Sequence, residues 1–434
     1  MKHTLLALLI FGSPFVGAQS LTLQDALQTM SGGSPALQKA TSEANEAYWQ
    51  KVEAFSAFLP RITGQGQYLT DHKYMLTDIA LPGSPTVIEI PNIVPTTIYS
   101  LQAEYGIFDG FASTNRLRAS RMMEQAAQNQ MDWSKFQTER EVTLQFYRAL
   151  AAKTLKQVAE SNLKTLQDHL RDVNLLKSNG LSTKYDVLRV EVQVSEANSE
   201  VLNTVDDVDT ATGHLAELMG QTTLVDPRGE LPEPPADLLE HPDKLNDTNR
   251  ADLAALSQRA TAMRYQKYAA DAHWLPRVGL FGQVQYYDNL DDHFNDWGSF
   301  RNAYLVGFNL TWNLFDGFAD IARQRETAEK EIQTQKTLRI SQLKAQQDVG
   351  LWTRKYKYFQ SVYRARQSDI GKAKESVRLA KEGRRVGSRT NTDFLDAETD
   401  LFRSQAGAIK AQLGIIEALI NLELSTGRKL YDFR

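Results

Sequence analysis

Residues 107–112 read IFDGFA, and residues 314–319 read LFDGFA. Each copy stands between a run of alternating apolar and polar residues and a long run without proline. Alternation with a period of two predicts a strand, and the long run that follows favours a helix. The two stretches therefore mark two strand-to-helix junctions and predict a duplicated structural unit.

Two further landmarks repeat in the same order. The sequence LPRI at residues 59–62 returns as LPRV at 275–278, and NGLST at 179–183 corresponds to VGSRT at 386–390. The FDGF motif and the glycine of the later landmark are separated by the same number of residues in both halves. The segment that joins them therefore has a fixed length.

We expect a first repeat at residues 19–221 and a second at residues 250–434. A linker at residues 222–249 joins them, because its prolines fall among acidic residues and favour an extended chain.

The first residues predict a secretory signal. A charged start, a short apolar run at residues 5–10 and small residues at 16–18 predict cleavage after Ala18, so residues 1–18 are expected to be a signal peptide. A retained anchor is the alternative, but the run is far shorter than the roughly 20 residues of a membrane-spanning helix. No later stretch reaches that length, so no transmembrane helix is expected.

Four strands are predicted, at residues 62–74, 96–108, 278–288 and 301–315. Each is long enough to cross a bilayer when tilted, which needs about 9–11 residues. Aromatic residues near the strand ends favour an interfacial membrane belt, with Tyr105, Phe108, Trp312 and Phe315 as its candidates. The alternative is a soluble sheet with one buried face. The segment between the first two strands, residues 75–95, is expected to be an irregular loop.

Two very long helices are predicted after the FDGF motifs, at residues 112–178 and 319–385. Glycines interrupt each run, and helices return at 183–219 and 390–426. Each repeat thus contains a long coiled-coil hairpin, with its tip near residues 179–186 in the first repeat and 386–393 in the second.

Four strands cannot close a barrel in a membrane, where open sheet edges are not tolerated. The smallest barrels have about eight strands. Either several copies assemble or the strands are not in the membrane. Three copies would give twelve strands continued by a hollow ring of long helices, although two or four copies would also close.

Composition excludes several classes of site. The chain has no Cys, which excludes disulfides, thiolate metal sites and a lipidated N-terminal Cys. Its formal net charge of −4 and the lack of a basic face argue against nucleic acid. The seven His residues form no metal-binding pair, and no phosphate-binding loop is present. We expect neither an enzyme nor a cofactor or metal site.

In this order, the duplicated pieces resemble the TolC-like outer-membrane channel proteins of Gram-negative tripartite efflux pumps and type I secretion systems. The resemblance spans essentially the whole mature chain. It is strongest at residues 386–397, VGSRTNTDFLDA, which resemble the second hairpin tip of that family. Residues 21–27, LTLQDAL, resemble its mature N-terminus.

The resemblance implies a homotrimer with a twelve-strand β-barrel in the outer membrane, continued by an α-helical barrel across the periplasm. The helical barrel would taper shut at its inner end. It would open when a periplasmic adaptor (membrane fusion) protein and an inner-membrane ABC, RND or MFS transporter engage. The absence of an N-terminal Cys fits the unlipidated members.

Asp393 and Asp396 lie three apart at a helix start and share one face. The resemblance implies that such positions form an acidic ring at the periplasmic constriction, and a ring of this kind attracts cations. The alternative role is helix capping. The resemblance also implies that Asp186 and Arg389 form a gate latch, against the alternative of two solvated charges. Arg384 and Tyr185 depart from the family pattern at the latch.

The two tips also resemble the adaptor-docking tips of the family, against the alternative that their glycines serve only the turn. The docking candidates are Gly180, Leu181, Ser182, Thr183, Val386, Gly387, Ser388 and Thr390. We therefore expect a passive export duct in the outer membrane, in contact with its lipid. The partner transporter would select the cargo, either drugs or secreted protein. The alternative function is an anchored structural or adhesive coiled-coil protein.

Overall fold

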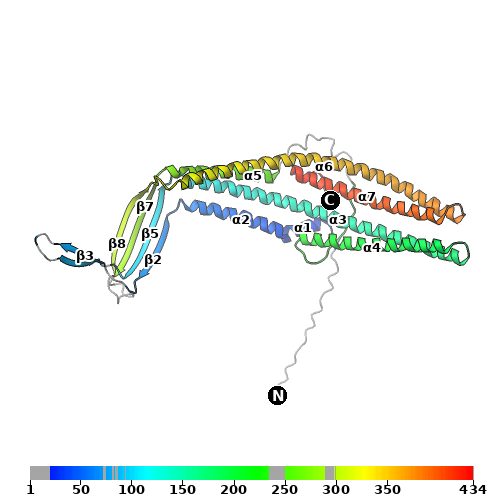
Figure 1. Ribbon diagram of the computed structural model, residues 1–434, viewed down its shortest axis with the longest axis horizontal. Coiled ribbons are helices and arrows are strands. Elements are labelled where there is room, and N and C mark those ends of the chain that lie inside the picture. The colour runs from blue at the N-terminus through cyan, green and yellow to red at the C-terminus, as the bar shows by residue number, and fades with distance from the viewer. Residues whose placement is uncertain are drawn as a thin grey trace, which may run out of the picture. The chain divides into compact units, whose positions relative to one another are not determined.

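The computed structural model describes residues 20–71, 75–80, 83, 87–92, 94–233, 250–288, 298 and 300–433. The predicted signal peptide and the linker residues 234–249 lie outside this part. Long helices dominate, and a small group of strands accompanies them (Figure 1). The chain divides into two compact units. We call them the helical unit, from residues 1–43, 129–253 and 340–434, and the sheet unit, from residues 44–128 and 254–339.

Four antiparallel strands form the main sheet of the sheet unit, in the order β2-β5-β7-β8. They are β2 Arg61–Tyr68, β5 Thr97–Phe108, β7 Arg277–Asp288 and β8 Arg301–Thr311. The central pair joins one strand of each repeat, with Leu101 opposite Val284. β2 and β8 are the edge strands of this sheet.

Two of these strands are shorter than predicted. β2 ends at Tyr68 and not at residue 74, and the last bond in its register runs from the Leu69 N–H to the Thr96 carbonyl at 2.8 Å. Residues 72–74 lie outside the described residues. β8 ends at Thr311 and not at residue 315, and the next side chain, Trp312, donates its Nε1–H to the Trp274 carbonyl at 3.2 Å.

The prediction of an irregular loop at residues 75–95 is wrong. β3 Met75–Ala80 and β4 Val87–Asn92 pair as a separate antiparallel ribbon. Ile79 lies opposite Ile88 in this ribbon, and β-branched pairs of this kind favour strands even between prolines.

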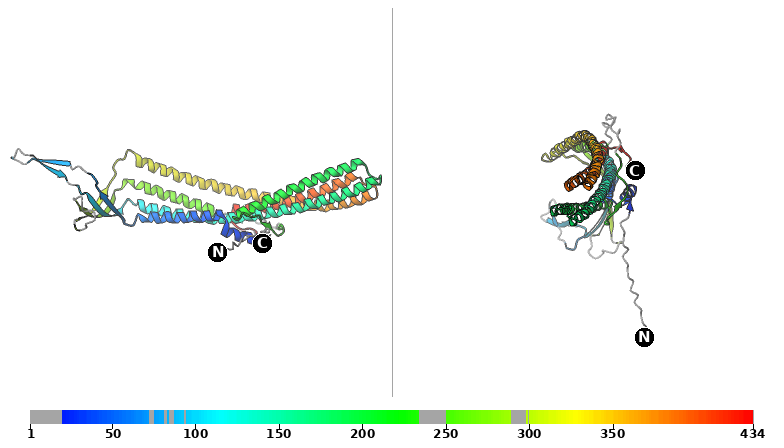
Figure 2. Two further views of the ribbon diagram at one scale, coloured as in Figure 1. Left: turned by 90° about the horizontal axis from the view of Figure 1, so that it is seen from below. Right: turned by 90° about the vertical axis from the view of Figure 1, so that its right-hand side faces the viewer.

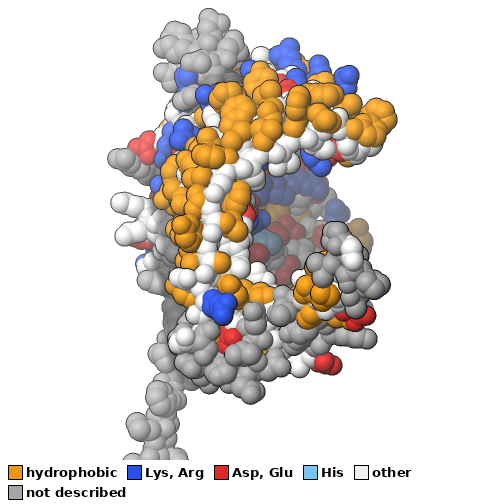
Figure 3. All heavy atoms as spheres, turned by 90° about the vertical axis from the view of Figure 1, so that its left-hand side faces the viewer, with side chains coloured by type: hydrophobic (Ala, Val, Ile, Leu, Met, Phe, Trp, Pro, Cys, Tyr) orange, Lys and Arg blue, Asp and Glu red, His pale blue; other side chains and the backbone are white. Residues whose placement is uncertain are grey.

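One face of the main sheet is apolar and exposed. Along β8, alternate side chains are 68–82% exposed, and they are Tyr304, Val306, Phe308 and Leu310. Their partners on β7 are Val284, Gly282, Leu280 and Val278. Figure 3 shows hydrophobic side chains gathered along this side of the molecule. A soluble sheet would cover such a face, so the face needs a non-aqueous neighbour.

The two FDGF motifs fold into the same turn. Gly110 and Phe111 have φ of 70° and 67°, and Gly317 and Phe318 both have φ of 71°. A left-handed phenylalanine is rare because its Cβ crowds the backbone. The two phenylalanines of each motif meet edge to face, with ring centroids 5.5 Å apart in the first copy and 5.4 Å in the second.

The aspartate of each motif caps the helix that follows. Asp109 Oδ2 accepts the Ser113 N–H at 2.7 Å, and Asp316 Oδ2 accepts the Asp320 N–H at 2.8 Å. Side-chain acceptors at this position satisfy N–H groups that a helix start leaves free. The duplicated sequence thus forms a duplicated strand-to-helix junction.

Both junctions open into helices of 67 residues, α3 Ala112–Ser178 and α6 Ala319–Arg385. Their return helices are α4 Lys184–Leu218 and α7 Asn391–Thr426. The remaining helices are α1 Leu23–Gly33, α2 Pro35–Ser56 and α5 Ala251–Asp271, which the short 3-10 helix η2 Ala272–Trp274 follows. Figure 2 shows the two hairpins side by side. Within the described residues, none of the helices is apolar and long enough to cross a membrane.

The helical unit has its own core. In it, side chains of α1, α3, α4 and α7 meet the C-terminal segment, and the fully buried members include Met30, Val142, Leu215, Met219, Ile415 and Ile420. A two-residue strand, β1 Ser20–Leu21, pairs in parallel with β6 Asp226–Pro227. The first part of the predicted linker is therefore paired with the N-terminal segment.

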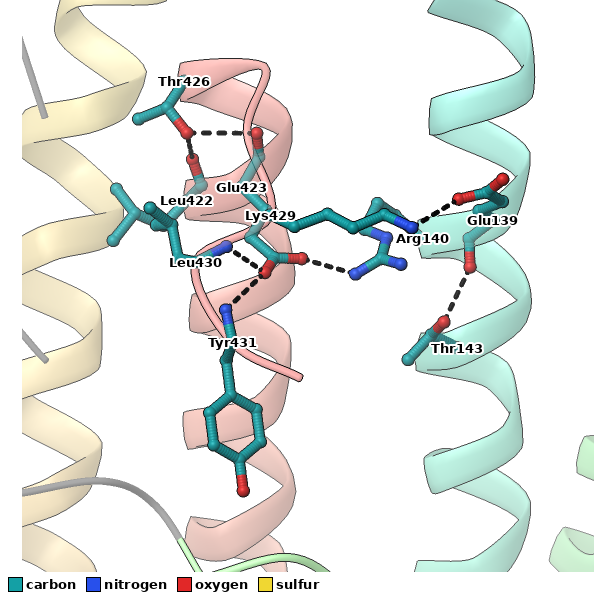
Figure 4. Close-up of polar contacts among 9 residues, drawn as sticks. All are labelled: Glu139, Arg140, Thr143, Leu422, Glu423, Thr426, Lys429, Leu430 and Tyr431. Atoms are coloured by element: carbon teal, nitrogen blue, oxygen red, sulfur yellow. Dashed lines mark hydrogen bonds and ion pairs between the residues drawn. The ribbon is translucent and has the colours of Figure 1, made fainter. Parts of the chain in front are cut away.

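A buried ion pair crosses this core (Figure 4). Arg140 of α3 and Glu423 of α7 lie 2.7 Å apart, and their side chains are 5% and 0% exposed. The other carboxylate oxygen of Glu423 accepts the N–H groups of Leu430 and Tyr431 at 2.6 and 2.9 Å. The carboxylate therefore fixes the C-terminal segment onto the hairpins.

We expect Glu423→Ala to lower the free energy of unfolding by about 3 kcal/mol, because it leaves the Arg140 charge buried without its partner. The matched control is Glu417→Ala, on the same helix. It removes the 2.9 Å pair with Arg148 of α3, whose members are 38% and 43% exposed. Exposed pairs contribute at most about 1 kcal/mol. Urea unfolding followed by circular dichroism measures both, and equal losses would contradict the prediction.

Candidate functional site

The two hairpin tips turn in the same way. Gly180 and Gly387 have φ of 74° and 76°, the left-handed conformation that glycine adopts without strain. The Leu181 N–H donates to the Leu176 carbonyl, and the Ser388 N–H donates to the Gly383 carbonyl, each at 2.8 Å. Each of these hydrogen bonds spans six residues, from the N–H of the sixth to the carbonyl of the first, and completes a Schellman motif at the end of a long helix.

A capping box starts each return helix. Thr183 is the N-cap of α4, and its N–H and hydroxyl donate to Asp186 Oδ2 at 3.0 and 2.6 Å. Thr390 is the N-cap of α7, and its N–H donates to Asp393 Oδ2 at 2.8 Å. The alternative of helix capping, considered for Asp393 from the sequence, is thus present in the chain.

These hydrogen bonds favour the charged carboxylates. The Thr183 hydroxyl, and next its N–H, hold the pKa of Asp186 below its usual value. The Thr390 N–H, and next its hydroxyl, do the same for the pKa of Asp393, and the Arg389 guanidinium adds to the effect. Both aspartates therefore stay ionised near neutral pH.

The structure does not bring the two latch residues together within one chain. The Asp186 carboxylate bonds to Thr183 and Ser182 of its own turn. Arg389 lies in the other tip, where it is exposed and acts on Asp393. Among the described residues, these two charges form no ion pair with each other, so a latch between them requires a neighbouring copy.

Asp396 lies one turn after Asp393 and is exposed. It lines a groove of about 340 Å³ between α4 and α7, together with the cations Arg189 and Arg403. Its surroundings are therefore of mixed charge, and they differ from those of Asp393.

The docking candidates lie where the sequence predicted, in the two turns. Ser182 is half-buried and the other seven are exposed, and they are Gly180, Leu181, Thr183, Val386, Gly387, Ser388 and Thr390. Leu181 and Val386 are 75% and 77% exposed, which is unusual for large apolar side chains. Each tip thus exposes one large apolar side chain.

Sequence reasoning missed the contacts that join the two hairpins near the tips. His169 of α3 is 3% exposed, and its Nε2 lies 2.5 Å from Asn391 Oδ1 at the start of α7. Its ring packs against that of Phe394, with centroids 4.5 Å apart and the ring planes inclined by 44°. Arg384 of α6 lies over the same Phe394 ring and 3.6 Å from Asp172 of α3. We call these five residues the His169 cluster.

Burial has a clear effect on the imidazole of this cluster. Burial, and next the nearby Arg384 charge, lower the pKa of His169 to about 4, against smaller opposing effects of Asn391 and Asp172. Three buried polar atoms of the cluster have no hydrogen-bond partner among the described residues: His169 Nδ1, Arg384 Nη1 and Asn391 Nδ2. Such incomplete hydrogen bonding makes the contact costly and therefore easy to open.

Little in the sequence indicated that these five residues would meet. Arg384 stood out only as a departure from the family pattern, and a single His on a long helix resembles an ordinary surface residue. A second contact between the hairpins, from Arg189 to the Thr392 hydroxyl at 2.9 Å, gave no signal at all.

The belt candidates all lie at the helix-facing end of the sheet. Tyr105, Trp312 and Phe315 are 40%, 56% and 73% exposed, and Phe108 is half-buried. The structure adds more exposed aromatic residues there, namely Phe111, Trp274 and Phe318, of which two belong to the FDGF motifs. Among the described residues, no group of three or more His, Asp or Glu side chains is placed to hold a metal ion.

Comparison with known proteins gives a consistent result. The model of the family described as outer membrane efflux protein matches residues 24–221 and 246–428. A search of curated proteins found no significant match.

Solved structures share the fold. VceC of Vibrio cholerae is 17% identical with a TM-score of 0.76, over 94% of this chain and 97% of that one. The CmeC outer membrane channel of Campylobacter jejuni is 13% identical with a TM-score of 0.77, over 94% and 87%. The open-state MtrE outer membrane channel of Neisseria gonorrhoeae is 18% identical with a TM-score of 0.74, over 94% and 89%. The predicted fold class, long helices with a small β portion and an internal repeat, is confirmed.

We expect the contact between the hairpins to weaken as the pH falls from about 6.5 towards 4. In the unfolded chain His169 takes up a proton near its ordinary pKa of 6.5, whereas in the folded chain it stays neutral until the pH approaches about 4. The contribution of His169 to the stability of the contact is therefore fully present above pH 6.5 and is lost as the pH falls from 6.5 towards 4. The charged neighbours are Asp172 on α3 and Arg384 on α6, while α7 contributes the uncharged Asn391 and Phe394. Hydrogen exchange at the start of α7, corrected for intrinsic rates, measures the loss.

His169→Phe is expected to abolish most of this pH dependence, since phenylalanine keeps the ring contact and does not titrate. The control is His214→Phe, which changes an exposed histidine of α4. The buried Glu398, whose pKa burial raises, titrates alike in all three proteins. An unchanged pH dependence in His169→Phe would refute the assignment.

Proposed function

Because the chain belongs to the outer membrane efflux protein family, we propose that it is the outer-membrane exit duct of an export system, gated at its helix tips. Channels of this family work with a periplasmic adaptor and an inner-membrane transporter as a pump. Transport through the duct is passive, and the transporter supplies the energy. The family and its structural relatives are channels and not enzymes.

The main sheet carries this proposal. It has an apolar exposed face and two edge strands, β2 and β8, and lipid tolerates no open edge. Pairing β2 of one copy with β8 of the next would close both edges. Three copies would give a barrel of twelve strands in contact with outer-membrane lipid, and the aromatic residues at its helix-facing end would lie at the periplasmic interface.

The helices support assembly through complementary charge. α6 carries 17 Lys and Arg against 8 Asp and Glu, whereas α4 carries 2 against 8. Exposed apolar residues of α6 are separated by multiples of seven at Leu351, Tyr358 and Leu379, and Val386 just beyond the helix keeps the same spacing. A heptad stripe on an exposed face is a coiled-coil seam without its partner. We place the α4 of a neighbouring copy there, which would continue the barrel of helices across the periplasm.

In this trimer the tips would form the gate. Asp186 and Arg389, separate within one chain, would pair between copies and hold the tips together. Asp393 and Asp396 of three copies would surround the axis as an acidic constriction. The exposed turns at Gly180 and Gly387 would receive the adaptor, whose partner is an ABC, RND or MFS transporter. The cargo class, drugs or secreted protein, depends on that transporter.

We expect Asp186→Ala and Arg389→Ser each to raise the resting conductance of the purified protein in planar bilayers several-fold, because each removes one half of the latch. The matched control is Asp25→Ala. Asp25 forms the same capping box with Thr22 at the start of α1, away from the tips. If Asp25→Ala raises the conductance as much as Asp186→Ala, the effect comes from lost capping, and unchanged conductance in both latch variants would refute the latch.

We expect Asp393→Asn to reduce the preference of the open pore for cations. Asparagine retains an acceptor for the Thr390 N–H, so the capping box survives while the charge is lost. The reversal potential in a salt gradient measures the change. Asp209→Asn, on an exposed part of α4 outside the tip, serves as the control. Selectivity equal to that of the unmodified protein would leave Asp393 as a cap alone.

A further inference from the structure

A pocket of about 400 Å³ lies in the sheet unit, where the helices meet the sheet. It is separate from the tips and from the exposed apolar face. β7 contributes Arg277 to the pocket lining, from the strand face opposite to Val278 and Leu280, whose partners across the ladder are the exposed Leu310 and Phe308. The pocket therefore opens on the polar side of the sheet.

Two cations of the pocket have no partner. Arg116 of α3 and Arg277 make no hydrogen bond, ion pair or ring contact through their side chains with the described residues. A third cation, Arg323, is bound to Asp320 at 2.7 Å. The other acid, Asp109, is occupied by the N–H and the hydroxyl of Ser113 at 2.7 and 2.5 Å. Both acids are thus engaged, and two guanidinium groups remain for a ligand.

A histidine supplies a defined acceptor beside them. The Nδ1 of His273 lies 2.9 Å from the Ala270 carbonyl, which can only accept, so Nδ1 carries the proton. In the neutral ring this leaves Nε2 as an acceptor. Nε2 is buried and has no hydrogen-bond partner in the part of the chain that the structure describes. A buried acceptor of this kind needs a hydroxyl or amine donor.

The remaining walls are small and apolar. Ala112, Ala119, Met123, Ala269 and Ala272 line the pocket between the polar groups. Small side chains leave room for the flat body of a ligand, and the volume lies in the range of small-molecule sites. An inorganic ion would gain nothing from these walls.

We propose that this pocket binds an organic acid with an apolar, aromatic-sized body and a hydroxyl group. The guanidinium groups of Arg116 and Arg277 hold its carboxylate, since their planar donors match that group in a bidentate way. His273 Nε2 accepts a hydrogen bond from the hydroxyl group of the ligand. If the duct proposed above is correct, the polar side of the sheet is the lumen, and such acids are among its cargo. This last step rests on the proposed function, whereas binding does not.

Equilibrium dialysis of the purified full chain in an uncharged detergent, with 3-hydroxybenzoate as the probe, tests the site. We expect saturable binding that weakens at least tenfold in the double variant Arg116→Gln/Arg277→Gln. The control Arg118→Gln/Arg325→Gln removes the same charge from α3 and α6 outside the pocket, and it retains the affinity. Equal affinity in the two double variants, or no binding to the unmodified protein, overturns the proposal.

Three further probes separate the contributions of the carboxylate, the hydroxyl group and the organic body of the ligand to the affinity. Uncharged 3-hydroxybenzyl alcohol is expected not to bind, and benzoate to bind several-fold more weakly than 3-hydroxybenzoate. His273→Phe removes the difference between the two acids. Inorganic phosphate that binds as tightly as 3-hydroxybenzoate would overturn the assignment to an organic acid.

Conductance of the same samples keeps the two proposals apart. Binding without any pore current would refute the duct and leave the site. Pore current without saturable binding would refute the site and leave the duct. Where both hold, 3-hydroxybenzoate reduces the current of the unmodified protein and not that of Arg116→Gln/Arg277→Gln.

Discussion

The carboxylate of Glu423 is the constraint on which the helical unit depends. It has no access to water, so every one of its interactions must come from the protein. Arg140 supplies one from the other hairpin, and two backbone N–H groups of the C-terminal segment supply the rest. The pair fixes the rotation of α7 against α3. Farther along the same helices, the His169 cluster and the Arg189–Thr392 bond join the hairpins near the tips.

Much of the fold could be predicted because its signals are local. The FDGF motif, the glycine turns and the Thr-x-x-Asp capping boxes each act within a few residues, and each occurs in both repeats with the same geometry. The ends of β2 and β8 could not be predicted, because alternation continues past the last ladder bond. The β3–β4 ribbon was missed because prolines in a short apolar segment resemble a loop. Among the described residues, its two strands pair with each other and not with the main sheet.

In the candidate site, too, the local features could be predicted from the sequence and the contacts between distant residues could not. The positions of Asp186 and Asp393 in the first turns were predictable from sequence, and so were the exposed turns. The partners of His169 were not, because Asn391 lies 222 residues away along the chain. A sequence pattern carries no record of which face of α3 meets the start of α7. The same limit explains why the sequence did not single out Arg116 and Arg277 of the sheet unit, although both line one pocket in the folded chain.

The equal length of α3 and α6, 67 residues each, has a consequence for how such a protein can change. Each residue adds about 1.5 Å of rise and about 100° of rotation. Removing one residue from a single hairpin would shift one tip along the other and turn His169 or its partners away. Length variants are therefore expected to arise in matched pairs, as whole heptads removed from or inserted into both repeats at once. Because of the duplication, the length of the long helix in each repeat limits the length that the other can adopt during evolution.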